Sequence, residues 1–308
     1  MLDVEPLLAR VQKPARYAGE EWNAVRKDWN KVGVRVAFAF PDVYEVGMSY
    51  LGLQILYHLV NSREDALMER VFAPWVDMEG EMRRRGVPLF TLESRRPVRD
   101  FDFLAFTLQY ELTFTNVLNM LDLAGLPLRA AERGPGHPLV VAGGPCAFNP
   151  EPLADFIDLF VIGEGEEVLG ELLDLYLELG GRRCDRQLFL RRAASLPGVY
   201  VPSLYRVLYK EDGTVLRVEP RGGAPPRVLK RVVRRFDGAP FPTRPVVPYL
   251  GVVHDRGMLE IQRGCTRGCR FCQAGMIYRP VREKKPDTLL QQAAALLKHT
   301  GYEEISLV

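Results

Sequence analysis

Three of the five cysteines in this chain lie within eight residues, in a C-x3-C-x2-C pattern. They are Cys265, Cys269 and Cys272, and Gly264 and Gly268 favour a loop conformation for the segment that carries them. Three thiolates on one loop can converge on a single inorganic centre, and soft sulfur ligands select zinc or iron–sulfur chemistry. The pattern therefore predicts a metal centre at this loop.

The number of ligands separates the kinds of centre. A structural zinc site or an ordinary electron-transfer cluster takes four protein ligands. The next candidate ligand, His299, lies beyond a whole predicted helix. A four-iron cluster held by three thiolates keeps one iron open, as catalytic zinc keeps an open position. The pattern favours such a cluster over two alternatives, which are a zinc site with a distant fourth ligand and three unrelated cysteines.

The residues around the cysteines predict one strand–loop–helix–strand unit. Residues 258–262 read as a strand that ends at the cysteine loop, and sites on parallel sheets lie at such carboxyl ends. Pro286 and Asp287 begin a helix that Gly301 ends, and residues 304–308 begin a second strand. This is the first unit of a parallel barrel. Because a full barrel takes about 250 residues, we expect the chain to be a fragment with an incomplete pocket.

The first two-thirds of the chain alternates between apolar strand patterns and helical patterns. We predict strands at 34–40, 103–108, 138–142 and 159–162, and helices near 51–60, 75–85, 112–124 and 166–179. The alternation predicts an α/β fold with a doubly wound parallel sheet and ligands at the strand ends. We expect a lead-in at 1–32, this domain at 33–180, a hairpin and proline-rich connecting arm at 181–256, and a truncated second domain at 257–308.

Glycines follow several of these strands. Glycine lets backbone amides approach a bulky ligand, and it also allows tight turns from strand to helix. Three glycine-containing segments on one edge of a sheet predict a binding crevice, with tight connections as the alternative. The segments contain Gly47, the pair Gly143 and Gly144, and the run Gly163, Glu164 and Gly165.

Composition restricts the location and the partners of the chain. Of its 308 residues 47% are hydrophobic and 26% are charged, which is ordinary for a globular protein. No apolar run approaches the roughly 20 residues of a membrane span, and the amino terminus is not a signal peptide. We therefore expect a cytoplasmic protein without membrane contact. The net charge of +2 does not indicate nucleic acid, and the basic runs at 230–235 and 279–285 read as solvated faces.

The cysteine triplet, with aromatic Phe271 just before its last member, resembles the signature of radical S-adenosylmethionine (SAM) enzymes. The resemblance implies that Cys265, Cys269 and Cys272 hold a 4Fe–4S cluster whose open iron chelates SAM. It places Phe271 as a wall near the adenosyl group. The cluster would cleave SAM reductively to a 5′-deoxyadenosyl radical, with electrons from an external donor such as flavodoxin or ferredoxin.

The segments 41–54 and 142–166 resemble the cobalamin-binding domain that precedes the barrel in one subgroup of this family. The resemblance implies a flavodoxin-like sheet and cobalamin contacts from the strand-end segments that contain Gly47, Gly143, Gly144, Gly163, Glu164 and Gly165. Related domains carry Asp-x-His-x-x-Gly, and the aligned residues here are Asp42, Tyr44 and Gly47. A phenol with a pKa of about 10 is a poor cobalt ligand. Cobalamin bound without this histidine, and a domain that keeps the fold without the cofactor, both stay open.

Together these features predict a cobalamin-dependent radical SAM enzyme that performs methyl transfer, or a related radical modification, on an unknown substrate. The sequence does not identify a catalytic residue beyond the cofactor contacts. Two alternatives remain. In the first, the N-terminal domain of a radical SAM enzyme binds substrate or RNA instead of cobalamin. In the second, the chain is a non-enzymatic iron–sulfur or zinc module.

Overall fold

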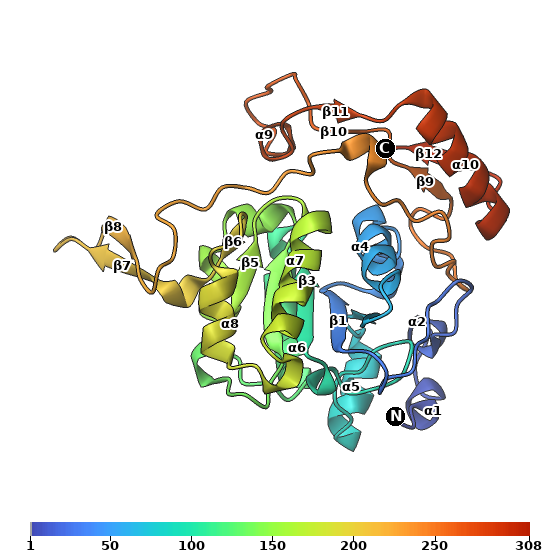
Figure 1. Ribbon diagram of the computed structural model, residues 1–308. Helices are drawn as coiled ribbons and strands as arrows, with labels where there is room; N and C mark the ends of the chain where they lie inside the picture. Colours follow the sequence, from blue (N-terminus) through green and yellow to red (C-terminus); the bar gives the residue numbers. More distant parts are fainter. Residues whose placement is uncertain (1) are drawn as a thin grey trace.

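A six-stranded sheet forms the centre of the protein in the computed structural model, which describes residues 2–308 (Figure 1). The strands follow the order β2-β1-β3-β4-β5-β6. All neighbours are parallel except β5 and β6, which are antiparallel. The predicted α/β fold with a parallel sheet is thus confirmed. The strands are β1 (Val34–Phe40), β2 (Ala66–Phe72), β3 (Phe103–Thr107), β4 (Leu139–Gly143), β5 (Leu159–Val161) and β6 (Val199–Tyr200).

Helices cover both faces of this sheet because successive strand residues point to opposite sides. Val36 and Phe38 of β1 pack with α4, α7 and α8, whereas Ala37 and Ala39 pack with α1, α5 and α6. The first layer contains α4 (Leu51–Asn61), α7 (Gly165–Glu178) and α8 (Arg186–Ala193), and the second contains α1 (Glu5–Leu8), α5 (Val76–Arg85) and α6 (Phe114–Leu123). The short helices α2 (Ala15–Ala18) and α3 (Tyr44–Gly47) complete this part.

Strand β2 carries buried charges and was not among the predicted strands. Arg70 has a fully buried side chain. Its guanidinium donates to Glu21 at 2.8 Å and to Glu93 at 2.6 Å. Because Glu21 belongs to the segment before β1, these ion pairs hold the start of the chain against the sheet.

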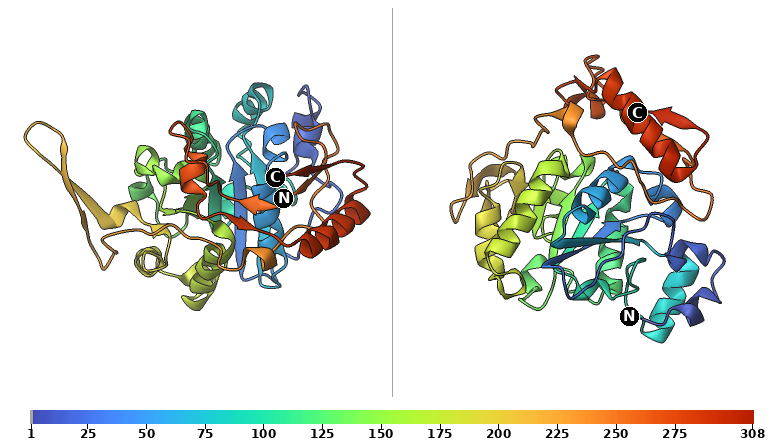
Figure 2. Two further views of the ribbon diagram at one scale, coloured as in Figure 1. Left: turned by 90° about the horizontal axis from the view of Figure 1, so that it is seen from above. Right: turned by 45° about the vertical axis from the view of Figure 1, so that its right-hand side comes forward.

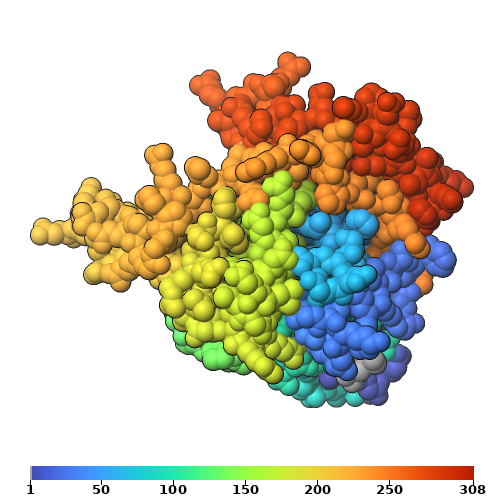
Figure 3. Space-filling model, in the orientation of Figure 1, coloured from blue at the N-terminus to red at the C-terminus, as the bar shows by residue number. Residues whose placement is uncertain are grey.

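The region between the two predicted domains is more ordered than the sequence indicated. Helix α8 and strand β6 lie beyond residue 180, yet they pack into the core of the sheet domain. The predicted hairpin is present as β7 (Tyr205–Tyr209) and β8 (Val215–Pro220), which pair antiparallel. It projects from the body of the molecule (Figures 1 and 3).

A second unit carries the cysteines. Strands β9 (Gly257–Leu259) and β12 (Ile305–Leu307) pair in parallel, and α10 (Pro286–Thr300) connects them, ending at Gly301 as predicted. The cysteine loop lies between β10 (Gln262–Arg263) and β11 (Arg282–Glu283) and contains the short helix α9 (Ala274–Ile277). This unit lies over the end of the sheet domain near α4 and α7 (Figure 2). Over residues 2–308, no helix is both long and apolar enough to cross a membrane.

Replacing Arg70 should destabilise the fold strongly. In Arg70→Met the side-chain volume is nearly kept, but Glu21 and Glu93 lose their buried partner. Breaking a buried pair in this way costs about 3–5 kcal/mol. Arg83→Met is the matched control, because Arg83 is 45% exposed in its pairs with Glu79 and Asp122 and its loss should cost at most about 1 kcal/mol. Urea unfolding followed by circular dichroism measures both, and equal losses in the two variants would contradict the role of Arg70.

Candidate functional site

A cavity of about 520 Å³ lies between the carboxyl ends of the sheet strands and the second unit. Thr107, Gly143 and Gly163 line it from the ends of β3, β4 and β5. Met258 of β9 and Gly264, the residue before Cys265, line it from the opposite side. The volume falls within the range of small-molecule sites, roughly 300–1,000 Å³. The sheet edge and the segment that leads into the cysteine loop therefore share one cavity.

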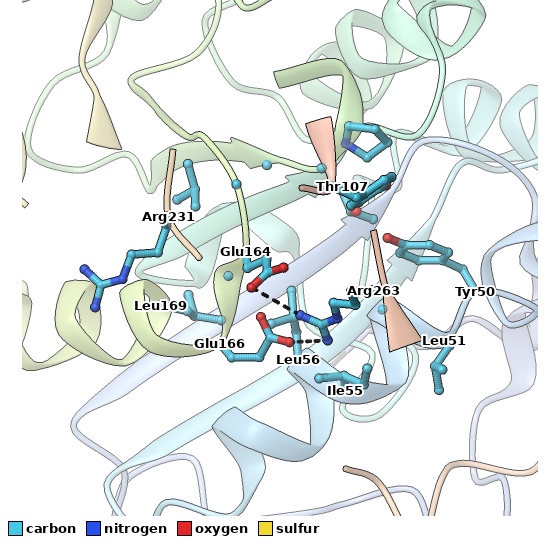
Figure 4. A pocket seen from close by; sticks show the side chains of 18 of the residues that line it. Tyr50, Leu51, Ile55, Leu56, Thr107, Glu164, Glu166, Leu169, Arg231 and Arg263 are labelled. Carbon is cyan, nitrogen blue, oxygen red and sulfur yellow. Dashed lines mark ion pairs between the residues drawn. The ribbon is translucent and has the colours of Figure 1, made fainter. Parts of the chain in front are cut away.

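One limb of this cavity is apolar. It extends from the strand ends along the face of the sheet covered by α4 and α7, where Phe38 and Met68 line it from the sheet. Ile55 and Leu56 line it from α4, and Leu169 lines it from α7 (Figure 4). This limb suits a flat apolar group, because it offers hydrophobic walls on both sides.

The rim of the cavity is charged and consists of ion pairs between the two units. Arg282 donates to Glu164 at 2.6 Å, and Arg263 pairs with Glu166 at 2.5 Å (Figure 4 shows the latter). Arg263 also donates to Glu260 at 2.7 Å. Burial alone would raise the pKa of Glu164, but hydrogen bonds from Arg282 and from the Val233 amide hold that pKa below its ordinary value. The rim carboxylate of Glu164 is therefore ionised at neutral pH.

The connecting arm crosses the sheet edge at Gly163. The Arg231 amide donates to the Ile162 carbonyl at 2.8 Å, and the Glu164 amide donates to the Arg231 carbonyl at 3.0 Å. Gly163 has a φ of +107°, and a Cβ there would lie 2.2 Å from the Arg231 carbonyl oxygen. The close approach of the arm therefore requires glycine at position 163, whether or not a ligand also approaches this residue.

The cysteine loop presents two of its three sulfur atoms to backbone donors. The Arg267 amide lies 3.5 Å from Cys265 Sγ, and the Gly275 amide lies 3.4 Å from Cys272 Sγ. Cys269 is exposed and Phe271 is 92% exposed. Amide hydrogen bonds to sulfur are a feature of iron–sulfur ligation, so the donor set fits a cluster. Within residues 2–308, no three Cys, His, Asp or Glu side chains are gathered closely enough to hold a metal ion. The ligand assignment stays a prediction.

Four residues predicted as cofactor contacts do not line the cavity, and one of them is the exposed Phe271. Tyr44 is buried in the core, where its hydroxyl donates to Glu21 at 3.0 Å, and burial together with Glu21 raises its pKa. A Cβ at Gly47 would lie 2.3 Å from the Phe72 ring, so this glycine serves packing. Asp42 accepts a hydrogen bond from the Tyr110 hydroxyl. The other predicted strand-end contacts, Gly143, Gly144, Gly163, Glu164 and Gly165, all line the cavity.

Sequence reasoning missed most of the charged rim. The basic runs at 230–235 and 279–285 were interpreted as solvated faces. That interpretation is wrong for Arg282, whose side chain is 14% exposed, and for Lys284, whose side chain is fully buried. The Lys230 ammonium donates to the Ile277 carbonyl at 2.8 Å. Desolvation lowers the pKa of Lys230. The signal that could have found them is the acidic segment 164–167, which offers the complementary charge.

Residues 52–202 match the family model described as "Radical SAM proteins, N-terminal". This part of the chain is the N-terminal domain of a radical SAM protein. The family resemblance that the cysteine triplet indicated is thereby confirmed.

One curated protein is similar in sequence to most of this chain at low identity. The uncharacterized protein MJ0966 of Methanocaldococcus jannaschii is 26% identical over 274 residues, which are 89% of this chain and 48% of that protein. The chain thus spans about half of the length of this curated relative.

Two solved structures share the fold over 89% of this chain at 16% identity. The cobalamin-dependent SAM radical enzyme OxsB with aqua-cobalamin bound has a TM-score of 0.54, and the chain covers 34% of it. The radical SAM methyltransferase TsrM of Kitasatospora setae, with cobalamin and a 4Fe–4S cluster bound, has a TM-score of 0.50, and the chain covers 48% of it.

Gly163→Ala should detach the connecting arm from the sheet edge. A Cβ cannot be accommodated 2.2 Å from a carbonyl oxygen, and the positive φ adds strain, together of order 1–3 kcal/mol. In Gly170→Ala, the control in α7, the new Cβ meets nothing within 4 Å, and stability should rise by up to about 1 kcal/mol. Limited proteolysis of the arm and thermal unfolding measure both effects. An unchanged arm in Gly163→Ala would contradict the structural role of this glycine.

Proposed function

We propose that this chain provides the cluster loop and the corrinoid site of a radical SAM enzyme. One observation carries the proposal: a single cavity is lined both by the strand ends of the N-terminal domain and by Gly264, the residue adjacent to Cys265. A ligand in this cavity would lie beside the cysteine loop. We further propose that the sheet is of the flavodoxin-like, cobalamin-binding type and that β9, α10 and β12 begin a radical SAM barrel.

Cys265, Cys269 and Cys272 are the proposed ligands of a 4Fe–4S cluster. Thiolate donors suit iron, and the amides of Arg267 and Gly275 already donate toward two of the sulfur atoms. When bound, the cluster supplies the electron that cleaves SAM, and cobalamin supplies a methyl-carrying cobalt. The chain's own residues hold these groups beside one another and exclude water.

The cavity suits a corrinoid by shape and by polarity. Its apolar limb between the sheet and α4 would take an aromatic base, and its charged rim would face the polar amides of a corrin ring. OxsB and TsrM, which share the fold, were solved with cobalamin bound, and this supports the proposal. Tyr44 takes no part in cobalt ligation, because it lies in the core with a raised pKa. We place Phe271 beside SAM, as the family resemblance implies.

The proposed reaction needs partners that this chain does not contain. An external one-electron donor, such as flavodoxin or ferredoxin, would reduce the cluster. Reduction of the cluster by such a donor takes place in a reducing compartment, which fits the expected cytoplasmic location. We propose methyl transfer or a related radical modification as the reaction class.

Loss of any one proposed ligand should abolish cluster assembly. Cys265→Ala, Cys269→Ala and Cys272→Ala should each lose nearly all iron and acid-labile sulfide after anaerobic reconstitution of the full-length protein. Cys146→Ala and Cys184→Ala are the controls and should keep the cluster, since both cysteines lie outside the loop. In the unmodified protein, the EPR signal of the reduced cluster should shift on addition of SAM. A cluster that survives in one of the three variants would contradict the assignment.

Filling the apolar limb should block corrinoid binding without unfolding the protein. Leu56→Trp places a bulky side chain into the limb from a half-buried position, and affinity for hydroxocobalamin should fall at least about tenfold, or 1.4 kcal/mol. Leu59→Trp is the control on the same helix, because Leu59 is half-buried outside the cavity. Corrin absorbance retained after desalting measures binding. If both variants bind like the unmodified protein, the cavity is not the corrinoid site.

A further inference from the structure

Strands β10 and β11, which form the base of the cysteine loop, each carry an arginine, and the two arginines are register partners. Strands β10 and β11 pair antiparallel, with Arg263 directly opposite Arg282. Like charges opposite one another destabilise a strand pair. The loop that this pair closes, residues 264–281, contains all three cysteines of the triplet. The base of the loop therefore requires compensating negative charge.

Part of the compensating charge is Glu260 of the same unit, to which Arg263 donates at 2.7 Å, and the rest comes from the N-terminal domain. Glu164 pairs with Arg282 and lies 3.7 Å from Arg263, and Glu166 pairs with Arg263 (Figure 4 shows both contacts of Arg263). We call these four residues the interdomain ion-pair cluster. Their side chains are only 6–14% exposed, so solvent screens them little. Phe236 of the connecting arm lies against both guanidinium groups, 5.1 Å from Arg263 and 5.6 Å from Arg282.

The same carboxylates also face the cavity. Glu164, Glu166 and Arg263 all line it, and Figure 4 shows the three side chains turned toward one another. Glu164 additionally accepts a hydrogen bond from the Val233 amide at 2.5 Å, which ties the connecting arm to the same point. A ligand in the cavity would thus contact the residues that fix the base of the loop.

We infer that Glu164 and Glu166 are positioning residues that hold the cysteine loop on the N-terminal domain. Their effect on the cluster rests on the proposed function, whereas their effect on the loop does not. They neutralise the paired arginines, so the loop keeps one orientation relative to the cavity. Without them, the repulsion between Arg263 and Arg282 would open the base of the loop.

The direct test is hydrogen exchange of residues 264–281 in the full-length protein without added cofactors. In Glu164→Gln/Glu166→Gln, exchange of this loop should be about tenfold faster, while β1 and β3 exchange at the unmodified rate. Glu171→Gln is the matched control, because Glu171 lies on the same helix and pairs with Arg231 of the connecting arm instead of the loop. Equal loop exchange in the double variant and the unmodified protein would overturn the inference, as would an equal increase throughout the sheet.

A charge exchange separates positioning from a general loss of stability. Glu164→Arg alone should speed loop exchange, and the addition of Arg282→Glu restores an ion pair of opposite polarity and should return loop exchange toward the unmodified rate. In reconstituted protein, Glu164→Gln/Glu166→Gln and Glu164→Arg should keep the iron content but lose most of the SAM-induced EPR shift, and the addition of Arg282→Glu to Glu164→Arg should restore it. No restoration by the charge exchange would overturn the positioning role. Failure of the proposed function would appear differently, as the absence of a SAM response in the unmodified protein.

Discussion

Two acidic residues at the start of α7 pair with two arginines at the base of the cysteine loop, where the two parts of this protein meet. Glu164 and Glu166 follow β5 directly, so the sheet fixes their position. Arg263 and Arg282 lie opposite one another on short strands, and their repulsion is offset by these carboxylates together with Glu260, to which Arg263 also donates. The cavity exists at this boundary because each part contributes one wall.

The glycines at the sheet edge allow close contacts within the chain as well as close contacts with a ligand. Gly163 lines the cavity, yet its positive φ is required by the arm that crosses it at Arg231. The arm then places Val233 and Phe236 against the interdomain ion-pair cluster. A glycine-rich strand end that suggests a binding crevice can therefore serve first to bring a distant segment to the rim of that crevice.

The sequence predicted those strands and helices whose burial or ends follow from the pattern of neighbouring residues. Strands β1, β3, β4 and β5 are mostly apolar, and α10 has a proline near its start and a glycine at its end. Strand β2 was missed because Glu69 and Arg70 look solvent-exposed in sequence. They are buried only because their partners, Glu21 and Glu93 among them, come from other segments.

The same contrast between local pattern and distant partners explains which residues of the candidate site could be predicted from the sequence. The strand-end residues Gly143, Gly144, Gly163, Glu164 and Gly165, which line the cavity, were predictable from strand position. The role of the cysteines as metal ligands, predicted from their spacing, stays a prediction. The charge partners were not, since Arg282 and Glu164 lie 118 positions apart in the chain. Tyr44 was misplaced because alignment with a related motif gives a position along the chain and not the direction of a side chain.

The arrangement also constrains any chemistry that takes place in the cavity. The strand ends and the apolar limb belong to the N-terminal domain, whereas the loop with the proposed metal ligands belongs to the second unit. A group bound in the limb and a group bound on the loop would keep a fixed relation only while the rim between them is closed. Charge pairing at the rim suits this requirement, because carboxylates and guanidinium groups with 6–14% exposure attract one another strongly and define a preferred geometry. The strand ends thus determine where a cofactor can lie, and the ion pairs determine what it faces.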